Sequence, residues 1–371
     1  MSQLLRVAAV DLGATSGRVM VAEVGDGHLE LSEVHRFPNG AVRVGDSLHW
    51  DVLGIHREVL AGLRMVALDG RLDGIGVDSW AVDHGLLDRT GALLGNPFSH
   101  RDARTDGVAA TVLDRVGADE LYGVTGLQQL PFNTIYQLVA AAGTPQLEVA
   151  ATLLLIPDLL CHWLTGGIGA EHTNASTTGL YDVRARAWAT ALAEQVGVPA
   201  SVLPALREPG EVLGALLPHV AEDVGADTSV PVIAVGSHDT ASAVVAVPAE
   251  GENFAYISSG TWSLVGLELD APVLSEAARL ADFTNEGGVD GTIRFLKNVT
   301  GLWVLSESVR VWNADLSSLL AAAARATPLR SVVDINDARL IPPGDMPARL
   351  VALAHDADEP VPPTPVEVTR C

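Results

Sequence analysis

Cysteine, basic residues and aromatic residues are all scarce in this sequence of 371 residues. Its two cysteines, Cys161 and Cys371, cannot build a disulfide framework, and we therefore expect a reducing compartment. Only 23 Lys and Arg stand against 46 Asp and Glu, which gives a net charge of −23. This balance disfavours non-specific nucleic-acid binding, which depends on neutralising phosphates. Local backbone N–H groups can still hold an anionic substrate.

Long apolar runs are missing as well. The most hydrophobic stretch, Val149–Leu164, is broken by Pro157 and Asp158 and is too short and too polar to span a membrane. The first residues, MSQLLRVAAVDLG, have neither the long apolar core nor the cleavage site of a signal peptide. We therefore expect a cytoplasmic protein.

What the sequence has is enough apolar material for a large core, since 48% of its residues are hydrophobic and only 19% are charged. At this length two domains are more common than one. The stretch PAEGE at Pro248–Glu252 resembles a linker. We therefore predict an N-terminal domain over residues 1–247 and a C-terminal domain over residues 248–371.

One stretch, VPVIAVGSHDTASAVVAVP at Val230–Pro248, joins a predicted strand to a predicted helix through a polar loop. The apolar, β-branched run Val230–Val235 is typical of a buried strand, and the small-residue run Thr240–Val247 suits a buried helix. The residues SHD, which end at Asp239, therefore follow the carboxyl end of a strand. Ligands bind at such strand ends in open α/β sheets.

Asp239 permits two interpretations. A carboxylate held between a strand and the start of a helix can act as a general base, and the helix dipole would favour its ionised form. An Asp at this position can also be an ordinary helix N-cap.

Leu5–Val24 contains two apolar strands joined by a turn of small and hydroxyl residues, which predicts a hairpin. Asp11 ends the first strand, and Gly13 and Gly17 permit unusual backbone geometry. Ala14–Ser16, between the glycines, offer N–H and hydroxyl donors as a phosphate-binding turn does. The spacing does not fit a P-loop, and a purely structural turn remains an alternative.

The same pattern returns at Phe254–Leu269, where a Ser-Ser-Gly-Thr turn separates two strands. Two such hairpins, with the strand-end Asp239 between them, indicate a duplicated α/β fold that holds a nucleotide between its halves. Actin-like ATPases have this organisation.

A further buried strand and a polar loop occupy Leu72–Leu87. Trp80, Asp83 and His84 of this loop could stack on a polyol and hydrogen-bond it. Trp80 could equally be a core residue.

Several stretches follow one another from Val7 to Leu350 in the order typical of one family: AVDLGATSGRVM, EVHRFPNG, VDSWAVDHGLLD, HRDARTDG, LPFNTIYQL, TNASTTGLYD, SHDTASAV, SSGTWSLVG, TNEGG, LKNVTGLW and PPGDMPARL. Together they resemble the FGGY family of carbohydrate kinases, and EVHRFPNG, FNTIYQL and SHDTASAV resemble its rhamnulokinase branch. The resemblance implies a two-domain actin-like ATPase (ribonuclease-H-like) α/β fold, with ATP and Mg²⁺ as cofactors.

The resemblance also implies roles for single residues, with Asp239 as the catalytic base. Asp11, beside the first turn, is the candidate to reach Mg²⁺ through water. The resemblance places Ala14, Thr15, Ser16, Gly17, Arg18, Thr261 and Ser306 at ATP, and Ala81, His238, Asp239, Thr240 and Asn298 at the sugar.

The sequence departs from the family pattern in three respects. Ala81 stands where the family usually has Gly, and Ser306 where it tends to have Gln, which affects fine specificity. Family members also continue past the position of Cys371 with a helix and a Gly-rich segment that packs on the adenine. We therefore expect a truncated chain whose second domain is incomplete and which binds ATP weakly.

The expected reaction is the ATP-dependent phosphorylation of L-rhamnulose at its 1-hydroxyl, giving L-rhamnulose 1-phosphate and ADP in L-rhamnose catabolism. The expected partners are the sugar and ATP, with no nucleic acid and no membrane, in a monomer or homodimer. Two alternatives remain open. One is a kinase of another ketose, such as fuculose or xylulose, and the other is a non-catalytic, truncated remnant.

Overall fold

The structure is a computed structural model that describes residues 4–251, 254–260 and 262–371. Its packing divides the chain into two compact units. The first is bounded as Met1–Glu252 with Glu268–Phe295, and the second as Asn253–Leu267 with Leu296–Cys371. Residues 268–295 therefore pack with the N-terminal part of the chain, although they follow the boundary predicted at residue 247.

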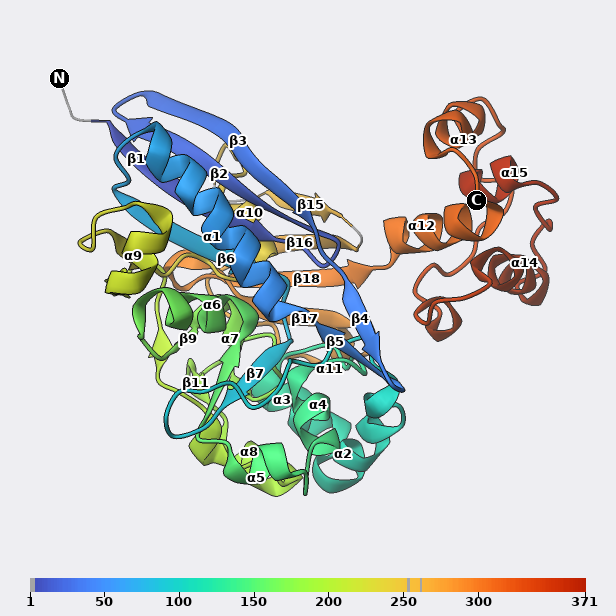
Figure 1. Cartoon of the computed structure of the whole chain (residues 1–371). Helices are drawn as coiled ribbons and strands as arrows, with labels where there is room; N and C mark the ends of the chain where they lie inside the picture. The colour runs from blue at the N-terminus through green and yellow to red at the C-terminus, as the bar shows by residue number, and fades with distance from the viewer. Residues whose placement is uncertain (1–3, 252–253, 261) are drawn as a thin grey trace. The chain divides into compact units, whose positions relative to one another are not determined.

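A mixed six-stranded sheet is the framework of the first unit, in the order β13-β14-β6-β1-β2-β3 (Figure 1). β1, β6 and β14 run parallel, whereas β2, β3 and β13 join them as antiparallel neighbours. The predicted hairpin at Leu5–Val24 is confirmed by the pairing of β1 with β2. The strands are β1 (Leu5–Leu12), β2 (Ser16–Gly25), β3 (His28–Pro38), β6 (Gly74–Ser79), β13 (Val212–Ala215) and β14 (Pro231–Ile233).

The parallel register aligns the carboxyl ends of three segments. Asp11 of β1 lies opposite Asp78 of β6, and Leu12 lies opposite Ser79. Ser79 in turn forms a parallel bridge to His238, beyond the end of β14. The first turn, the end of β6 and the SHD loop therefore meet at one edge of the sheet.

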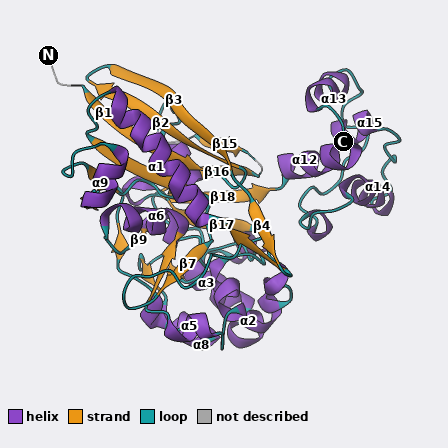
Figure 2. Cartoon of the chain, viewed as in Figure 1, coloured by secondary structure: helices purple, strands orange, loops and turns teal. Residues whose placement is uncertain are grey.

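Helix α1 (Val52–Asp69) packs against β1, β2 and β3, and Figure 2 shows it lying along the sheet. Its buried residues join those of the strands and of two further helices, α6 (Ile156–Thr165) and α9 (Pro218–Val224), in one core. Fully burying each large apolar side chain contributes about 1.5–3 kcal/mol. This core fixes the strands whose ends carry the polar residues.

A second core of the first unit lies among helices and the β7–β8 pair. The elements around it are β7 (His84–Leu87), α2 (Val108–Val116), α3 (Ala118–Thr125), α4 (Thr134–Ala140), α5 (Pro145–Val149), β8 (Thr152–Leu155) and α8 (Thr190–Val196). A separate small pair of strands, β4 (Ala41–Val44) and β5 (Ser47–Trp50), leads into α1.

Short elements complete the first unit. Helix α10 (Asp239–Val245) follows the SHD loop and confirms the predicted strand–loop–helix arrangement. The others are β9 (Ala170–Glu171), α7 (His172–Ala175), β10 (Tyr181–Asp182), β11 (Ala187–Trp188), β12 (Leu206–Arg207), α11 (Glu276–Leu280) and β17 (Phe283–Gly287).

The second unit contains the second predicted hairpin, formed by β15 (Ala255–Ser259) and β16 (Ser263–Leu269). Its helices pack around a small core of their own, centred on Leu340, Met346 and Leu350. They are α12 (Gly301–Trp312), α13 (Leu316–Ala323), α14 (Met346–Asp356) and α15 (Pro365–Arg370). Strand β18 (Ile293–Val299) begins in the first unit and ends in the second.

Two expectations from composition can be compared directly with the structure. Cys161 is buried and Cys371 half-buried, and both are free thiols, so no disulfide forms between them. Within the described residues, no helix has the length and apolar character needed to cross a membrane.

Candidate active site

Backbone hydrogen bonds join the polar strand ends into one site in the first unit. The N–H of Ser79 donates to the carbonyl of Ser237 at 2.9 Å, and the N–H of Trp80 donates to the carbonyl of Leu12 at 3.0 Å. The structure thus brings together three of the predicted groups, namely the first turn, Ala81 and the SHD loop.

The first turn is closed by its own backbone and by Asn39. The N–H of Gly13 donates to the carbonyl of Ser16 at 2.9 Å. Asn39 donates from its side chain to the carbonyl of Gly13 at 2.8 Å and from its N–H to that of Thr15 at 3.0 Å. Thr15 is exposed. Asn39 thus donates to two carbonyl oxygens of the turn, which would otherwise repel an anion. The turn is therefore suited to present its N–H and hydroxyl donors to a phosphate.

The two glycines of this turn do not serve the role predicted for them. Neither Gly13 nor Gly17 has a positive φ. A Cβ added at Gly17 would lie 2.3 Å from Cζ of Phe37, which is buried on β3. Gly17 is therefore required by close packing between β2 and β3, and the prediction of unusual backbone geometry was wrong.

Asp11 and Arg18 are paired across β1 and β2. Arg18 donates from Nε to Oδ2 of Asp11 at 2.7 Å, and its Nη2 lies 2.6 Å from the same oxygen. The side chains are 33% and 44% exposed, so both remain within reach of a ligand. In this arrangement the guanidinium proposed for phosphate and the carboxylate proposed for a metal ion neutralise each other.

Asp78 is a site residue that the sequence analysis did not single out. Its Oδ1 is buried and has no hydrogen-bond partner among the described residues. Burial raises the pKa of Asp78 well above its ordinary value, and the nearby carboxylates of Asp11 and Asp239 raise it further. No local pattern in the sequence identifies Asp78, because its position opposite Asp11 depends on the register of β1 and β6.

Asp239 is the first residue of α10, with its side chain 37% exposed. Its Oδ1 accepts hydrogen bonds from the N–H of Thr240 at 2.6 Å and from its hydroxyl at 3.2 Å. Desolvation raises the pKa of Asp239 above the ordinary value, and Asp11 adds to the effect, while His238 and Thr240 oppose it. The net shift is thus toward the protonated form relative to a free aspartate, opposite in direction to the shift expected from the helix dipole.

The SHD loop is held in place by Glu171, which is 1% exposed. One of its carboxylate oxygens accepts from the N–H and the hydroxyl of Ser237, both at 2.8 Å. The same oxygen accepts from the hydroxyl of Thr173 at 2.6 Å, and the N–H of His238 donates to that hydroxyl at 3.2 Å. Asn174 adds a side-chain bond to the carbonyl of Ser237 at 3.3 Å. The backbone beside Asp239 is therefore fixed by buried polar contacts.

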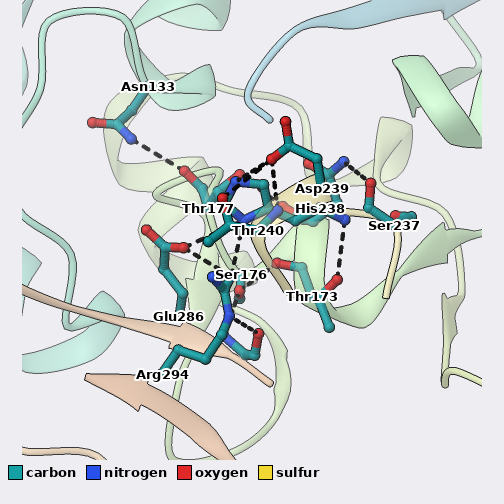
Figure 3. Close-up of polar contacts among 12 residues, drawn as sticks. Asn133, Thr173, Ser176, Thr177, Ser237, His238, Asp239, Thr240, Glu286 and Arg294 are labelled. Atoms are coloured by element: carbon teal, nitrogen blue, oxygen red, sulfur yellow. Dashed lines mark hydrogen bonds and ion pairs between the residues drawn. The ribbon is translucent and has the colours of Figure 1, made fainter. Parts of the chain in front are cut away.

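A buried cluster of charged and polar side chains contacts His238 from the strands β17 and β18 (Figure 3). Arg294 is 0% exposed, and its Nη2 lies 2.9 Å from Nδ1 of His238 and donates to Glu286 at 2.9 Å. Burial alone would raise the pKa of Glu286, but Arg294 and His238 outweigh this effect and hold it below the ordinary value. Glu286 and Arg294 were not predicted as site residues.

The loop that carries Ala81 is organised by the buried carboxylate of Asp83. Its Oδ2 accepts from Nε1 of Trp50 at 2.6 Å and of Trp80 at 2.9 Å, and it lies 2.7 Å from Nδ1 of His100. Gln137 donates to Oδ1 at 3.0 Å. Burial opposes the charge of Asp83, but His100 and the two indoles outweigh it and hold the pKa below the ordinary value.

The predicted contacts of Trp80, Asp83 and His84 with a polyol are therefore corrected. Trp80 is 6% exposed and Asp83 is 0% exposed with its oxygens already occupied, so the core interpretation is right. Burial lowers the pKa of His84 to about 4, which keeps it neutral near pH 7. Ala81 is the half-buried member of this loop. The next residue, Val82, has a φ of 69°, which a β-branched residue rarely adopts.

The remaining predicted site residues belong to the second unit. Asn298 is half-buried on β18, and Ser306 is exposed on α12. Thr261 lies outside the described residues, between the two strands of the second hairpin. The predicted phosphate and sugar contacts of these three residues stay predictions.

Comparison with known families now identifies the kind of protein. A model of the N-terminal domain of the FGGY family of carbohydrate kinases matches residues 7–246, and a model of its C-terminal domain matches residues 255–371. The chain belongs to the FGGY family of carbohydrate kinases. It is a carbohydrate kinase with ATP as a substrate.

Relatives of this FGGY kinase carry a more specific name. A rhamnulokinase of Enterobacter sp. (strain 638) is 44% identical to it over 99% of this chain and 75% of the relative. A rhamnulokinase of Bacteroides thetaiotaomicron is 40% identical over 98% of this chain and 76% of the relative.

Solved structures of sugar and glycerol kinases share the fold of this chain. Xylulose kinase from Lactobacillus acidophilus matches with a TM-score of 0.76 and 17% identity, over 87% of this chain and 66% of that one. Plasmodium falciparum glycerol kinase with ADP matches with a TM-score of 0.72 and 16% identity, over 88% of this chain and 68% of the glycerol kinase chain. The actin-like, two-domain α/β fold is thus confirmed.

The predicted truncation is not supported by these comparisons. The C-terminal domain model matches through residue 371, and the chain spans about three quarters of the length of the relatives. The domain boundary predicted at residue 247 stays a prediction.

The first turn and the neighbouring strand ends of this FGGY kinase also fit a magnesium ion. Mg²⁺ prefers carboxylate and water oxygens and is usually held by one or two carboxylates. Asp11 offers a partly exposed carboxylate. Asp78, in the adjacent strand, offers an oxygen that has no partner in the part of the chain that the structure describes. This donor set suits Mg²⁺ at the edge of the sheet.

Proposed function

We propose that this FGGY kinase transfers the γ-phosphoryl group of ATP to the 1-hydroxyl of L-rhamnulose. The observation that carries the proposal is the similarity to proteins named rhamnulokinase over 98–99% of this chain, combined with Asp239 in the SHD loop region of the site. A cytoplasmic location and a monomeric or homodimeric state stay predictions from the sequence.

Asp239 is the general base in this proposal. Its carboxylate is open to a ligand, and the SHD loop that carries it is fixed by Glu171. Accepting the proton of the attacking hydroxyl typically contributes a factor of about 10²–10⁴ in rate. The raised pKa of Asp239 makes it a stronger proton acceptor than an ordinary aspartate once it is ionised.

In this proposal the first turn binds the phosphates, together with one residue of the second hairpin and one of α12. Ala14, Thr15 and Ser16 would donate to phosphate oxygens, and Arg18 would exchange its partner Asp11 for phosphate charge. Thr261 and Ser306 are proposed to contact the nucleotide. Bound Mg²⁺ supplies charge neutralisation at the β- and γ-phosphates, with Asp11 and Asp78 as the residues that would hold it.

Sugar recognition falls to Ala81, His238, Thr240 and Asn298. A site that hydrogen-bonds particular hydroxyls rejects sugars that lack them by large factors. The ketose preference is therefore decided by these side chains rather than by the phosphate turn.

The proposal is tested by an ADP-release assay with a panel of ketoses. We expect the specificity constant, kcat/KM, for L-rhamnulose to exceed that for L-fuculose and for D-xylulose by about 10²-fold or more. ATP hydrolysis without sugar is the control for uncoupled turnover. Equal or higher specificity constants for L-fuculose or D-xylulose would overturn the assignment of the sugar, while turnover of none of them would overturn the assignment as an active ketose kinase.

A further inference from the structure

Arg294 and His238 form a contact that determines the protonation of the imidazole. Arg294 lies on β18 and is 0% exposed, and its Nε donates to the carbonyl of Gly287 at 3.1 Å. Its Nη2 lies 2.9 Å from Nδ1 of His238 and 2.9 Å from Oε2 of Glu286 (Figure 3). The guanidinium therefore has three partners, which it contacts through Nε and Nη2, and Nη2 faces the imidazole.

A guanidinium has only N–H donors, so the ring nitrogen that faces it must be an acceptor. Nη2 carries two hydrogens, and these serve Nδ1 of His238 and Oε2 of Glu286. Glu286 also lies 3.3 Å from Nδ1. The shorter of the two contacts at Nδ1 is the one to Nη2, and a hydrogen on Nδ1 would point at the N–H group that Arg294 donates, so this contact leaves Nδ1 without a proton. His238 is then neutral, and its hydrogen is on Nε2.

The other side of the ring faces the site. Nε2 of His238 lies 3.5 Å from Oδ1 of Asp239, the proposed base. The charged groups that contact the imidazole are thus Arg294 and Glu286 at Nδ1 and Asp239 at Nε2. An Nε2–H at this position can donate to Asp239 in the free protein or to an oxygen of a sugar bound against Asp239.

We propose that Arg294 is a positioning residue that fixes His238 as the Nε2–H tautomer, so that His238 donates a hydrogen bond to the sugar. The second part rests on the proposed function, whereas the tautomer is a property of the free protein. Histidine tautomers are commonly set by the bond made at the opposite ring nitrogen.

The cost of burying Arg294 argues against a purely stabilising role. A buried ion pair is weak evidence for stability, because desolvating both charges offsets their attraction. Within the described residues, Nη1 of Arg294 is also buried without a hydrogen-bond partner, which adds to the cost. An apolar pair in place of Arg294 and Glu286 would satisfy packing between β17 and β18. It would, however, leave Nδ1 of His238 without a hydrogen-bond donor.

The tautomer is measured by nitrogen NMR on sugar-free protein with labelled histidine. The chain has 11 histidines, and the spectrum of His238→Gln identifies the two ring nitrogens of His238 by their loss. In the natural sequence we expect an unprotonated Nδ1 and a protonated Nε2. A protonated Nδ1 there, in either the other tautomer or the imidazolium, would overturn the proposal whatever the enzyme phosphorylates.

Two variants separate the contact of Arg294 from the charge of Glu286. Arg294→Met combined with Glu286→Met removes both charges together, so that no unpaired charge stays buried. We expect it to fold and to lose the single-tautomer signal of His238. Glu286→Gln keeps Arg294 and serves as the matched control, in which Nε2–H should persist. An unchanged His238 signal in the double variant would refute the role of Arg294.

Kinetics test the donation to the sugar. In the double variant we expect KM for L-rhamnulose to rise by about tenfold, the loss of one net hydrogen bond, while KM for ATP does not change. If both KM values rise together, or neither rises, His238 does not receive its sugar-binding geometry from Arg294. If the natural enzyme phosphorylates no ketose, the proposed function fails while the tautomer measurement still decides the structural part.

Discussion

Asp83 and Asp239 have opposite pKa shifts, because their partners differ. Asp83 receives the N–H groups of Trp50, Trp80 and Gln137 and faces His100, and its pKa is lowered. Asp239 accepts hydrogen bonds from the N–H and hydroxyl of Thr240 and lies near His238, but desolvation outweighs these contacts and raises its pKa. Asp83 is thus a fixed anion that holds the loop, and Asp239 is the group suited to take a proton.

The raised pKa of Asp239 predicts the acid side of the pH profile. Only ionised Asp239 accepts a proton, so activity should fall as the pH is lowered through the pKa of Asp239. Because this pKa is raised, the loss should begin at a pH above the ordinary Asp pKa of about 3.9. The check is kcat/KM for L-rhamnulose from about pH 8 down to about pH 4, with circular dichroism at each pH to show that the chain stays folded. A folded enzyme whose activity falls only at or below the ordinary pKa would contradict the assignment.

Asp83→Asn should lower the free energy of unfolding by about 3 kcal/mol or more, because a carboxamide cannot accept from all four neighbours. The folded pKa is lowered, so this stabilisation is present above the ordinary pKa and is lost as pH falls through the folded value. Urea unfolding near neutral and at acid pH measures both effects.

Asp69→Asn is the control for Asp83→Asn, since Asp69 is 82% exposed and forms a surface ion pair with Arg6. It should change the free energy of unfolding by no more than about 0.5 kcal/mol. If Asp83→Asn unfolded at the same urea concentration as this control, Asp83 would not organise the loop.

At the scale of elements, the close approach of β2 and β3 behind the first turn depends on Gly17. Gly17→Ala should cost about 1–3 kcal/mol, because its Cβ would lie 2.3 Å from Cζ of Phe37. Gly40→Ala is the matched control, since a Cβ there meets no atom within 4 Å. The free energy of unfolding is the measurement, and Phe37→Leu should partly restore Gly17→Ala. Equal stability of the two alanine variants would be inconsistent with this packing.

Local patterns predicted several elements correctly. Both hairpins have a glycine in their turn, Gly236 follows the strand before the SHD loop, Pro248 follows the helix after it, and all of these elements carry continuous or alternating apolar residues. The same patterns placed Asp11 and Asp239 at strand ends. These signals succeed because they depend on residues close together in the sequence.

Contacts between distant segments could not be predicted in this way. That Asp78 lies opposite Asp11 depends on the register of β1 and β6, which no local pattern shows. The loop at Trp80 was open to two interpretations because partners from distant segments, such as Trp50, bury its polar groups. Arg294 likewise reaches His238 only through tertiary packing.

At the scale of the whole molecule, the first unit holds the proposed base and most of the predicted sugar contacts. It also contains residues 268–295, so Glu286 and Arg294, which belong to the part matched by the C-terminal family model, contact His238. The second unit holds Asn298 and Ser306. The boundary predicted at residue 247 lies between His238 and these two residues in the sequence, although all three belong to the first unit.

The central claim is that this FGGY kinase phosphorylates the 1-hydroxyl of L-rhamnulose with Asp239 as the base. Phosphorus NMR of the product, made by the natural sequence and by Asp239→Asn, tests it most directly. We expect ADP and a single phosphomonoester on C1 in equal amounts, and at least about 10²-fold slower turnover by Asp239→Asn, which keeps the shape of the side chain but cannot take the proton. L-rhamnulose should bind both forms equally well. A phosphate on another carbon, or undiminished turnover by Asp239→Asn, would contradict the account.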